Sequence, residues 1–400
     1  MNSTRLFKKT VIAATIALAS QQAVAAGFQL NAQSATGLGR AFAGDAVIAD
    51  NASVMSRNAA AMALFDSHQF SGGVNVISTE IKVTDIETAI DSGNSATNKS
   101  DTPVPNIYYV HRLNDKIALG AGVYSNFGTK NNFDKSFGDG ISGNYGGETQ
   151  ITSINYALAA SYRVNEKLSL GAGIDIVEGT GVLKRNTTGN LLDIDAKGTG
   201  IGFNIGTVYE ADENNRYGLS YHYSPLIEAK GKIELAGGVL DYSDEKLKLP
   251  LPSMLEFSGY HKITDSKFAV HYSLQWIGWS AFDKIETSGG SFSKDYKWKD
   301  GYHVALGGTY YMSQDWTFRA GYMFDSAAQD EITSISVPDS NRHWFSAGLS
   351  YHMDKHTVDF GATYLLGEDV SVTEGSGLSK LTATTHANAI LAGVQYSYSF

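Results

Sequence analysis

The 400-residue sequence contains no cysteine, only six prolines and, beyond its first 25 residues, no run of 18 uninterrupted apolar residues. The lack of cysteine excludes a disulfide framework, so an exported chain must be held by packing or by closure of a sheet. The lack of a long apolar run excludes membrane-spanning helices. Positive charge is also scarce, with 31 Lys and Arg against 41 Asp and Glu. This balance argues against nucleic acid as a partner, because phosphate binding needs clustered positive charge.

The first 25 residues have the layout of a secretory signal peptide. Three basic residues are followed by an apolar stretch at residues 11–19 and by Ala-Val-Ala at residues 23–25, which fits a small-x-small cleavage site. The apolar stretch is too short to span a membrane. We therefore predict a signal peptide at residues 1–25 with cleavage after Ala25, which leaves 28 Lys and Arg against 41 Asp and Glu, a formal charge of −13.

From about residue 67 onward, apolar residues alternate with small or polar ones. In KLSLGAGIDIV one face carries Leu168, Leu170, Ala172, Ile174 and Ile176, and the other carries Ser169, Gly171, Gly173 and Asp175. The same period recurs in RYGLSYHY, WTFRAGYMF and TVDFGATYL. A period of two indicates β-strands. Because the second face holds Gly, Ser, Asn and Ala more than Lys and Glu, the pattern is typical of a membrane barrel with a polar lumen.

Short polar turns recur at regular distances along the chain. Their centres are 50, 49, 51, 50 and 39 residues apart, at Asp115, Asn165, Asn214, Asp265, Asp315 and Asp354. Each step holds two strands and one longer loop, so the six turns separate seven hairpins. We predict an all-β fold, a transmembrane antiparallel β-barrel of about 14 strands over residues 67–400 with both termini periplasmic. The sheet must close on itself, because lipid offers no hydrogen-bond partner to a free edge.

The sequence ends in GVQYSYSF, in which Val394, Tyr396, Tyr398 and Phe400 share one face. A terminal aromatic residue on such a strand resembles the signal that barrel-assembly machinery recognises, so Phe400 is the predicted contact. Together with the signal peptide, this ending predicts a multi-pass protein of the bacterial outer membrane, in contact with outer-membrane lipid.

The stretch SATGLGRAFAG, at residues 34–44, resembles a phosphate-binding loop, but the rest of that signature is missing. Phe42 stands where the third glycine of G-x-G-x-x-G belongs, and no strand precedes the stretch. Residues 26–66 show no alternation and are rich in Ala, Gly and Asn, with a helix-like piece near residues 54–64 that Ser53 could cap. We predict that residues 26–66 fold back into the lumen as a plug.

Residues 26–66, AGFQLNAQSATGLGRAFAGDAVIADNASVMSRNAAAMALFD, resemble the N-terminal signature of the FadL family, the outer-membrane long-chain fatty acid transporters. The resemblance continues in NNRYGLSYHY, SGYHKI, VHYSLQW, KDGYHVALGGTYY and DWTFRAGYMFD, and so covers nearly the whole mature chain. It implies a 14-stranded barrel closed by an N-terminal hatch, with the fatty acid bound in the lumen. It also implies lateral release into the membrane where the third strand kinks toward the hatch. Nothing in the sequence indicates an energy source, so we expect passive transport.

The residues that match the family's gate lie in two places. The third strand corresponds to residues 116–128, and the candidate for its kink is the segment YSNFG, which comprises Tyr124, Ser125, Asn126, Phe127 and Gly128. The alternative is that Gly128 only opens the next loop. In the hatch, the family carries Asn-Pro-Ala where this chain has Asn58, Ala59 and an alanine. We expect Asn58 to face YSNFG, and we expect Ala59 to permit one more helical hydrogen bond than proline would.

Arg185 and Lys294 match the basic residues that the family uses for the carboxylate. Arg185 shares odd numbering with the polar face of its strand, which predicts that it lies in the lumen if no bulge intervenes. A guanidinium suits a carboxylate because it can donate two parallel hydrogen bonds. The alternatives for Arg185 are an internal ion pair and a solvated charge at the rim.

Lys294 lies in or near a loop, where alternation gives no information. On the strand that follows, we expect Lys297 and Lys299 to share the lumen face with His303 and to offer substitute ligands. The intervening aromatic residues are expected to face lipid or the interface: Tyr296, Trp298 and Tyr302.

Two loops that form an outer apolar groove in the family are short in this chain, at residues 186–199 and 235–248. Five apolar residues could still form a small patch for first capture: Leu191, Leu192, Ile194, Val239 and Leu240.

Other functions fit the sequence less well. A lipase-like barrel needs a Ser-His arrangement, and the ten histidines are scattered, so we expect no enzymatic activity, metal or cofactor. A general porin would not need a hatch. Channels for aromatic or aliphatic hydrocarbons share the fold, and Arg185 would then have no carboxylate to bind. A phage-receptor or adhesin role is compatible with any of these. We expect a monomer that binds a long-chain fatty acid or a similar hydrophobic ligand.

Overall fold

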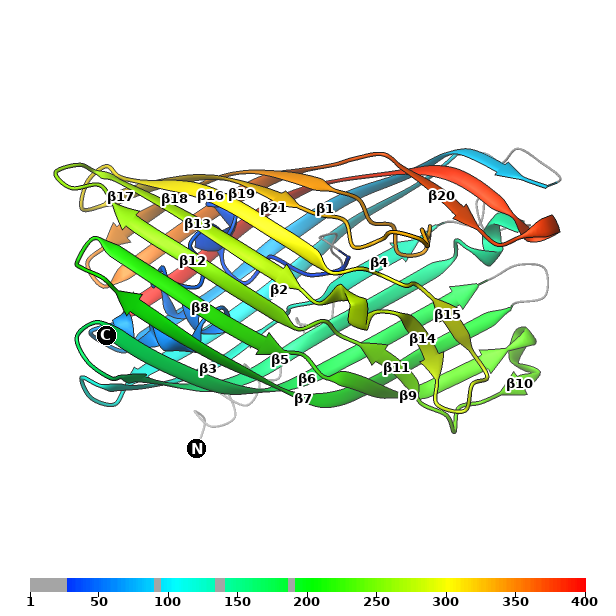
Figure 1. The fold of residues 1–400 in the computed structure, drawn as a ribbon, viewed down its shortest axis with the longest axis horizontal. Helices are drawn as coiled ribbons and strands as arrows, with labels where there is room; N and C mark the ends of the chain where they lie inside the picture. Colours follow the sequence, from blue (N-terminus) through cyan, green and yellow to red (C-terminus); the bar gives the residue numbers. More distant parts are fainter. Residues whose placement is uncertain (1–26, 90–94, 134–140, 186–190) are drawn as a thin grey trace, which may run out of the picture.

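The computed structural model describes residues 27–89, 95–133, 141–185 and 191–400, which form a closed antiparallel β-barrel of 14 strands (Figure 1). The predicted all-β barrel is confirmed. The predicted signal peptide at residues 1–25 lies outside the described residues. No helix in the described part of the chain is long and apolar enough to span a bilayer.

Within the described residues, eight barrel strands are single segments and six are divided in two. The undivided strands are β1 (Gln69–Thr88), β2 (Ala96–Arg112), β5 (Glu148–Arg163), β6 (Leu168–Arg185), β7 (Leu192–Glu210), β17 (Trp316–Asp325), β18 (Arg342–Met353) and β21 (Leu381–Ser399). The divided strands are β3 (Ile117–Tyr124) with β4 (Gly128–Asn132), β8 (Asn215–Tyr223) with β9 (Leu226–Leu235), β11 (Leu247–Pro250) with β12 (Met254–Lys262), β13 (Phe268–Ile277) with β14 (Lys284–Thr287), β15 (Ser293–Asp295) with β16 (Gly301–Tyr311), and β19 (His356–Gly367) with β20 (Val370–Glu374). The shorter elements are β10 (Leu240–Asp241) and the 3-10 helices η3 (Ile141–Asn144), η4 (Ala236–Gly238), η5 (Trp279–Ala281) and η6 (Gly377–Ser379).

The first and last strands close the barrel. β1 pairs with β21 from Gln69 opposite Ser399 to Thr88 opposite Leu381. The amide of Phe400 donates to the carbonyl of His68 at 3.0 Å, which fixes the chain end beside the start of β1. The C-terminus therefore lies at the end of the barrel that carries the short turns (Figure 1).

Alternation along β6 separates a lipid-facing side from a lumen side. Ile174 and Ile176 are 61% and 53% exposed on the outer surface, whereas Asp175 between them is buried. The register of β6 with β5 and with β7 continues without a shift from Leu168 to Arg185. The side on which a residue of β6 lies therefore follows from its number, as a strict period of two requires.

Residues 27–66, called the hatch below, fold inside the barrel (Figure 1). They contain the short helix α2 (Ala35–Leu38) and the 3-10 helices η1 (Ala52–Ser56) and η2 (Ala59–Leu64). The sequence suggested one helical piece capped by Ser53, which is wrong. Asn51 and Asn58 cap the two 3-10 helices, each with a side-chain oxygen that accepts a backbone N–H.

Glycines on the lumen side of the wall let the hatch backbone approach the strands. A Cβ added at Gly171 of β6 would lie 2.2 Å from the amide nitrogen of Ala60 in the hatch. A Cβ at Gly321 of β17 would lie 2.1 Å from the carbonyl oxygen of Arg40. These distances are shorter than van der Waals contact, so only glycine fits at both positions.

Ion pairs hold the hatch together and attach it to the wall. Arg40 contacts Asp45 at 2.6 Å and Asp50 at 2.7 Å, and Arg319 of β17 contacts Asp50 at 3.2 Å. Burial acts to raise the pKa of Asp50, but the positive charges of Arg319 and Arg40 outweigh it and lower the pKa to about 2. Asp50 is therefore ionised at neutral pH and links two guanidinium groups.

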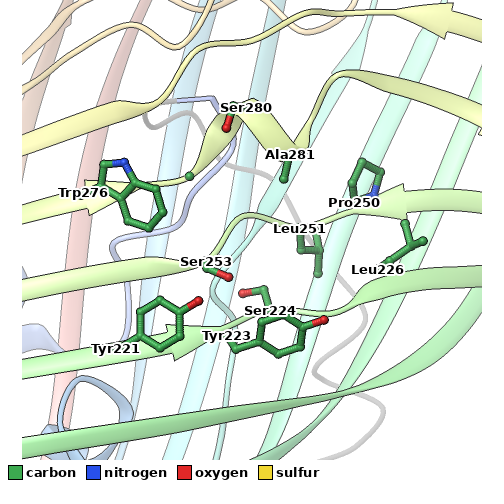
Figure 2. Close-up of a pocket in the computed structure, with 11 residues that line it drawn as sticks. Tyr221, Tyr223, Ser224, Leu226, Pro250, Leu251, Ser253, Trp276, Ser280 and Ala281 are labelled. Atoms are coloured by element: carbon green, nitrogen blue, oxygen red, sulfur yellow. The ribbon is translucent and has the colours of Figure 1, made fainter.

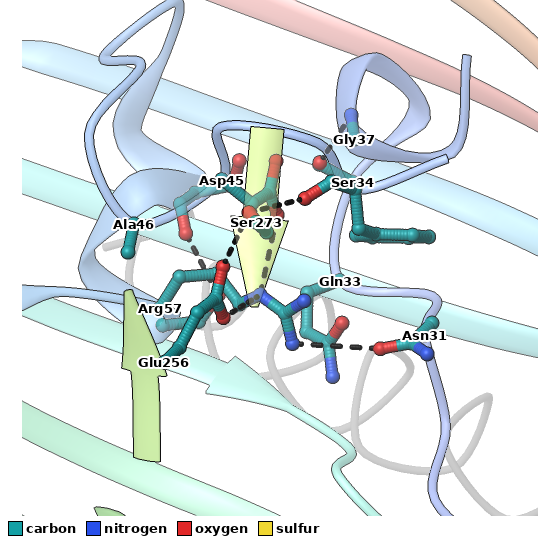
Figure 3. A network of polar contacts seen from close by, with 12 residues as sticks. Asn31, Gln33, Ser34, Gly37, Asp45, Ala46, Arg57, Glu256 and Ser273 are labelled. Atoms are coloured by element: carbon teal, nitrogen blue, oxygen red, sulfur yellow. Dashed lines mark hydrogen bonds and ion pairs between the residues drawn. The ribbon is translucent and has the colours of Figure 1, made fainter. Parts of the chain in front are cut away.

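Arg57 makes a second link between hatch and wall. Its Nε lies 3.3 Å from Asp45 and 3.5 Å from Glu256 of β12 (Figure 3). The Ser273 hydroxyl of β13 donates to Glu256 at 3.1 Å and accepts from the amide of Gly44 at 2.9 Å. Because burial of an unpaired charge is costly, this network favours one fixed position of the hatch.

Candidate ligand-binding lumen and lateral opening

The third barrel strand is interrupted within the predicted segment. β3 ends at Tyr124, and β4 begins at Gly128. β5 runs unbroken beside both, with Tyr124 opposite Asn155 and Gly128 opposite Thr152. Between these two pairs the third strand advances by four residues, whereas β5 advances by three. One extra residue in one strand is a β-bulge, which bends that strand. The alternative, that Gly128 only opens a loop, is wrong, because β4 continues from it.

The interruption leaves a gap in the wall between β2 and β4. β2 pairs with β3 only from Ile107 opposite Val123 to Arg112 opposite Ala118. Among the described residues, no pairing joins β4 to the remainder of β2. Pro103 and Pro105 lie on that part of β2, which pairs continuously with β1. A proline fits such an edge because it has no N–H to leave without a partner.

The first residues of the hatch pair with the interrupted strand from inside. Gln29 forms an isolated antiparallel bridge with Phe127. The amide of Leu30 donates to Asn126 O at 2.7 Å, and the amide of Gly128 donates to Phe28 O at 2.8 Å. Residues 28–30 of the hatch therefore pair with YSNFG, and the Gln33 side chain adds hydrogen bonds to Ser125 O at 3.2 Å and to Asn126 Oδ1 at 3.1 Å.

Asn58 does not face YSNFG, so that prediction is wrong. Its Nδ2 donates to Ala46 O at 2.8 Å and to Thr207 O of β7 at 3.1 Å. Ala59 is the first residue of η2. A helix leaves its first amides unpaired, so alanine at this position gains no helical hydrogen bond over proline, and that expectation is also wrong.

An apolar core fills the lumen between the hatch and the long loops. Phe28 packs its ring 4.7 Å from that of Trp279 and 6.2 Å from that of Phe127, measured between centroids. The buried core includes Leu183, Leu192, Ile194, Ile227, Ile233, Leu247, Leu249, Leu251, Ile277, Phe282, Ile285, Tyr296 and Trp298. This core extends from Phe127 at the interrupted strand to side chains of β9, β11 and β14.

Arg185 lies in the lumen, as its parity predicted. Its residue is 5% exposed, and its guanidinium donates to Glu148 O and Lys184 O at 2.8 Å each and to Thr149 Oγ1 at 2.9 Å. No acidic side chain among the described residues lies within ion-pair distance of it. The alternative of an internal ion pair therefore finds no support in this part of the chain.

Lys294 is paired inside the protein. Its Nζ lies 3.2 Å from Glu374 Oε2 and donates to Ser334 Oγ at 3.1 Å and to Ser336 Oγ at 2.9 Å. Its charge is also 5.3 Å from the centre of the Tyr296 ring. Lys294 therefore offers less free charge to a ligand than Arg185 does.

The prediction that Lys297 and Lys299 face the lumen is wrong. Both are exposed, and Lys299 pairs with Asp330 at 3.3 Å. Tyr296 and Trp298, expected outside, are buried in the apolar core. The cause is local, because residues 296–300 belong to neither β15 nor β16 and Lys297 has a φ of 48°, so alternation does not carry across the segment.

Sequence reasoning missed the buried aromatic side chains behind this segment. Among the described residues, the indole nitrogens of Trp279 and Trp298 and the hydroxyl of Tyr296 have no hydrogen-bond partner. Their burial had no periodic signal, because all three lie outside the regular strands. The only sequence signal is the density of aromatic residues between residues 276 and 302.

The predicted outer apolar patch is divided. Leu191, Val239 and Leu240 are exposed, whereas Leu192 and Ile194 belong to the lumen core, so the five residues do not form one surface. Most of the predicted loop at residues 186–199 is strand, because β7 begins at Leu192; residues 186–190 lie outside the described residues.

A closed barrel with an internal hatch, an apolar lumen and a gap in its wall defines an outer-membrane channel that carries its own plug. The chain belongs to the family described as "Outer membrane protein transport protein (OMPP1/FadL/TodX)", whose sequence profile matches residues 16–400. It is thus an outer-membrane protein.

Two relatives match nearly the whole chain. It is 35% identical over 452 residues to a long-chain fatty acid transport protein of Escherichia coli, with 100% of both chains covered. It is 36% identical over 461 residues to outer membrane protein P1 of Haemophilus influenzae, covering 98% of this chain and 99% of that one.

Solved structures show the same fold. A Pseudomonas aeruginosa FadL homologue superposes with a TM-score of 0.83 at 21% identity, covering 94% of this chain and 100% of that one. The toluene transporter TodX of Pseudomonas putida gives 0.69 at 19% identity, covering 94% and 100%.

Proposed function

We propose that this protein carries long-chain fatty acids passively across the outer membrane, and that the ligand leaves sideways through the gap between β2 and β4. The observation that carries the proposal is one apolar lumen core with the buried Arg185, which has no ion-pair partner among the described residues, at its outer side and a wall gap at its inner side. The relative at 35% identity, which is named a long-chain fatty acid transport protein, supports it.

The lateral route follows from the solvation of the acyl chain. Each methylene that passes from an apolar medium into water costs about 0.8 kcal/mol. A periplasmic exit would expose the whole chain, whereas the gap beside Phe127 opens from an apolar core toward lipid. The hatch residues 28–30 cover this gap from inside, so release requires them to move.

The carboxylate is assigned to Arg185. This guanidinium is held in place by two backbone carbonyls and Thr149, and it has no acidic partner among the described residues. Lys294 supplies weaker attraction, because Glu374 offsets its charge. That the protein acts as a monomer and that Phe400 contacts the assembly machinery stay predictions.

A second candidate is uptake of uncharged aromatic or aliphatic hydrocarbons. It is favoured by the bonds that Arg185 already makes to backbone carbonyls, which satisfy part of its donor capacity without a ligand. Saturable binding of oleate, with no comparable binding of a matched alkene, would exclude this candidate.

A reversible disulfide tests the lateral route. Gln29 and Phe127 lie opposite each other in an antiparallel bridge. The hydrogen bonds are made by the residues on either side of them, so the two form a non-hydrogen-bonded pair. The Cα atoms of such a pair are about 4.5 Å apart. That spacing suits a disulfide, and the chain has no other cysteine. The double cysteine variant should bind oleate but not take it up in cells, and a reductant should restore uptake. Normal uptake by the fully oxidised variant would contradict lateral release, and each single cysteine variant is the control.

A further inference from the structure

Four consecutive barrel strands are interrupted at one level of the wall. The interruptions separate β8 from β9, β11 from β12, β13 from β14 and β15 from β16. On the side of the short turns, regular pairing of these strands ends at one row of residues. In this row Met254 of β12 lies opposite His222 of β8 and Ile277 of β13, and Ile277 lies opposite Gly301 of β16. Pairing resumes beyond, where β11 pairs with β9 and β14. This region, called the wall break below, is separate from the gap between β2 and β4.

Proline marks both irregular regions of the wall. Of the six prolines in the chain, Pro103 and Pro105 lie beside the gap, and Pro225, Pro250 and Pro252 lie at the wall break. An N–H without a partner is costly beside lipid, and proline has none. Five of six prolines at two places indicate that the wall break, like the gap, has a backbone adapted to incomplete strand pairing, although the Gly278 amide still donates to Ser253 O at 2.9 Å across it.

A hollow of about 460 Å³ lies at the wall break (Figure 2). Its apolar lining comes from Tyr221, Tyr223, Leu226, Pro250, Leu251 and Trp276, and its hydroxyl groups come from the two tyrosines and from Ser224, Ser253 and Ser280. None of the described residues that line it is charged, although the Asp300 carboxylate behind them accepts from Trp276 Nε1 and from the Ser280 amide at 3.0 Å each. Its size lies within the range of about 300–1,000 Å³ that is typical of small-ligand sites.

The hollow lies at the outer border of the lipid-facing belt. Ile201 and Leu226, on neighbouring strands, are 71% and 51% exposed apolar residues. Beyond Leu226 on the same strand, the exposed positions are charged, at Glu228 and Lys230. An amphiphile in the membrane places its polar group at this border and its chain below it.

The lining of the hollow and the apolar core of the lumen share one residue and adjoin at another. Leu251 lines the hollow and also belongs to the apolar lumen core. Gly278 lines the hollow, and Trp279, the next residue, is fully buried in the same core. A ligand in the hollow would therefore contact the residues that bound the lumen.

We propose that this hollow is a second, membrane-side binding site, which takes a single-chain carboxylic acid in its neutral form. The assignment rests on the proposed fatty acid function. Hydroxyl groups without charges suit a neutral carboxyl group, which desolvation favours over the carboxylate. A phospholipid or lipid A phosphate would need Lys or Arg in the lining, and the described residues supply neither there.

Fluorescence quenching tests the site in the full-length protein in lipid nanodiscs. The chain has no cysteine, so a single cysteine at Ala281, which lines the hollow and is exposed, can carry a small fluorophore. The matched control is a cysteine at Ala347, an exposed position on β18. We expect spin-labelled stearic acid to quench the label at Ala281 saturably, at about ten-fold lower concentration than at Ala347, with reversal by oleate. Filling the hollow with Ser253→Trp should abolish this saturable quenching, whereas Ala347→Trp should not.

The outcomes separate this site from the transport function. If cells take up oleate through the wild-type protein but quenching at Ala281 is linear and equal to that at Ala347, the hollow is ordinary lipid-facing surface and the inference is overturned. Equal competition by a phospholipid overturns it as well. If wild-type cells take up no oleate, the proposed transport function fails, whatever the quenching shows.

Discussion

Replacement of Arg185 by alanine should weaken fatty acid binding more than replacement of Lys294 does. Arg185 is the stronger candidate because no acidic side chain among the described residues lies within ion-pair distance of it, whereas Glu374 lies 3.2 Å from Lys294. A hydrogen bond to a charged group contributes about 1.5–3 kcal/mol, so loss of the guanidinium should raise the Kd for oleate roughly ten- to a hundred-fold. Lys294→Met should raise it by less.

The substitution also has a structural cost that must be separated from binding. Arg185 donates to two backbone carbonyls and to Thr149, and their loss leaves buried acceptors unpaired at about 1–3 kcal/mol each. Thr149→Val is the control, because it removes one of these hydrogen bonds and keeps the positive charge. It should change oleate binding little. Arg185→Lys should recover only part of the affinity, because an ammonium cannot donate two parallel bonds.

Titration of oleate and of a matched alkene against wild type and these variants gives the decisive comparison. The alkene lacks a carboxylate, so its binding should be almost unaffected by Arg185→Ala. Equal losses for the two ligands would refute the reasoning, because they would show that Arg185 supports the wall and not the head group. They would then favour the hydrocarbon candidate.

Three further predictions concern the hatch. The pKa of Asp50 is lowered from 3.8 to about 2, so its ion pairs should stabilise the hatch fully above pH 4 and lose this effect as the pH falls toward 2. Protection of the hatch from protease across this pH range measures the effect. Loss of that protection already near pH 6 would refute the assignment to Asp50. Ala59→Pro should keep uptake unchanged and not lower thermal stability, because Asn58 before it is already extended (φ −153°, ψ 107°); a lower melting temperature would count against this geometry. Gly171→Val should displace the hatch, because even a Cβ at this position would lie 2.2 Å from the Ala60 nitrogen. The variant should then admit small polar solutes in a liposome-swelling assay. Unchanged permeability would contradict the close approach of the hatch to the wall.

Sequence periodicity predicted residue positions only where strands are unbroken. Arg185 lies in the lumen because β6 keeps one register with both neighbours over its whole length. Lys297 and Lys299 were misplaced because the strand stops at Asp295 and restarts at Gly301, and no period of two spans the interval. The number of strands was predictable for a different reason, since short turns at nearly equal distances report hairpins whether or not their strands are continuous.

The hatch was the least predictable part of the chain. Its position depends on contacts with distant strands, such as that of Asn58 with Thr207 and that of Arg57 with Glu256, and neither leaves a local signal. The interrupted third strand was located through the family resemblance, whereas the part of the hatch that covers it, residues 28–30, was not. A sequence without alternation gives no register, so facing partners cannot be assigned from it.

Closure of β1 on β21 has a consequence for the order of assembly. The hatch is the first part of the chain after the predicted signal, and β21 is the last strand, so the hatch is synthesised long before the strand that completes the wall around it. Pairs such as Gln69 with Ser399 join residues near the two ends of the chain. Closing so long a loop costs conformational entropy before the contacts that offset this cost can form. The seam is therefore the last opportunity to enclose the hatch. A chain that closed with its hatch outside would have to reopen this seam, and lose all of its hydrogen bonds, to correct the error.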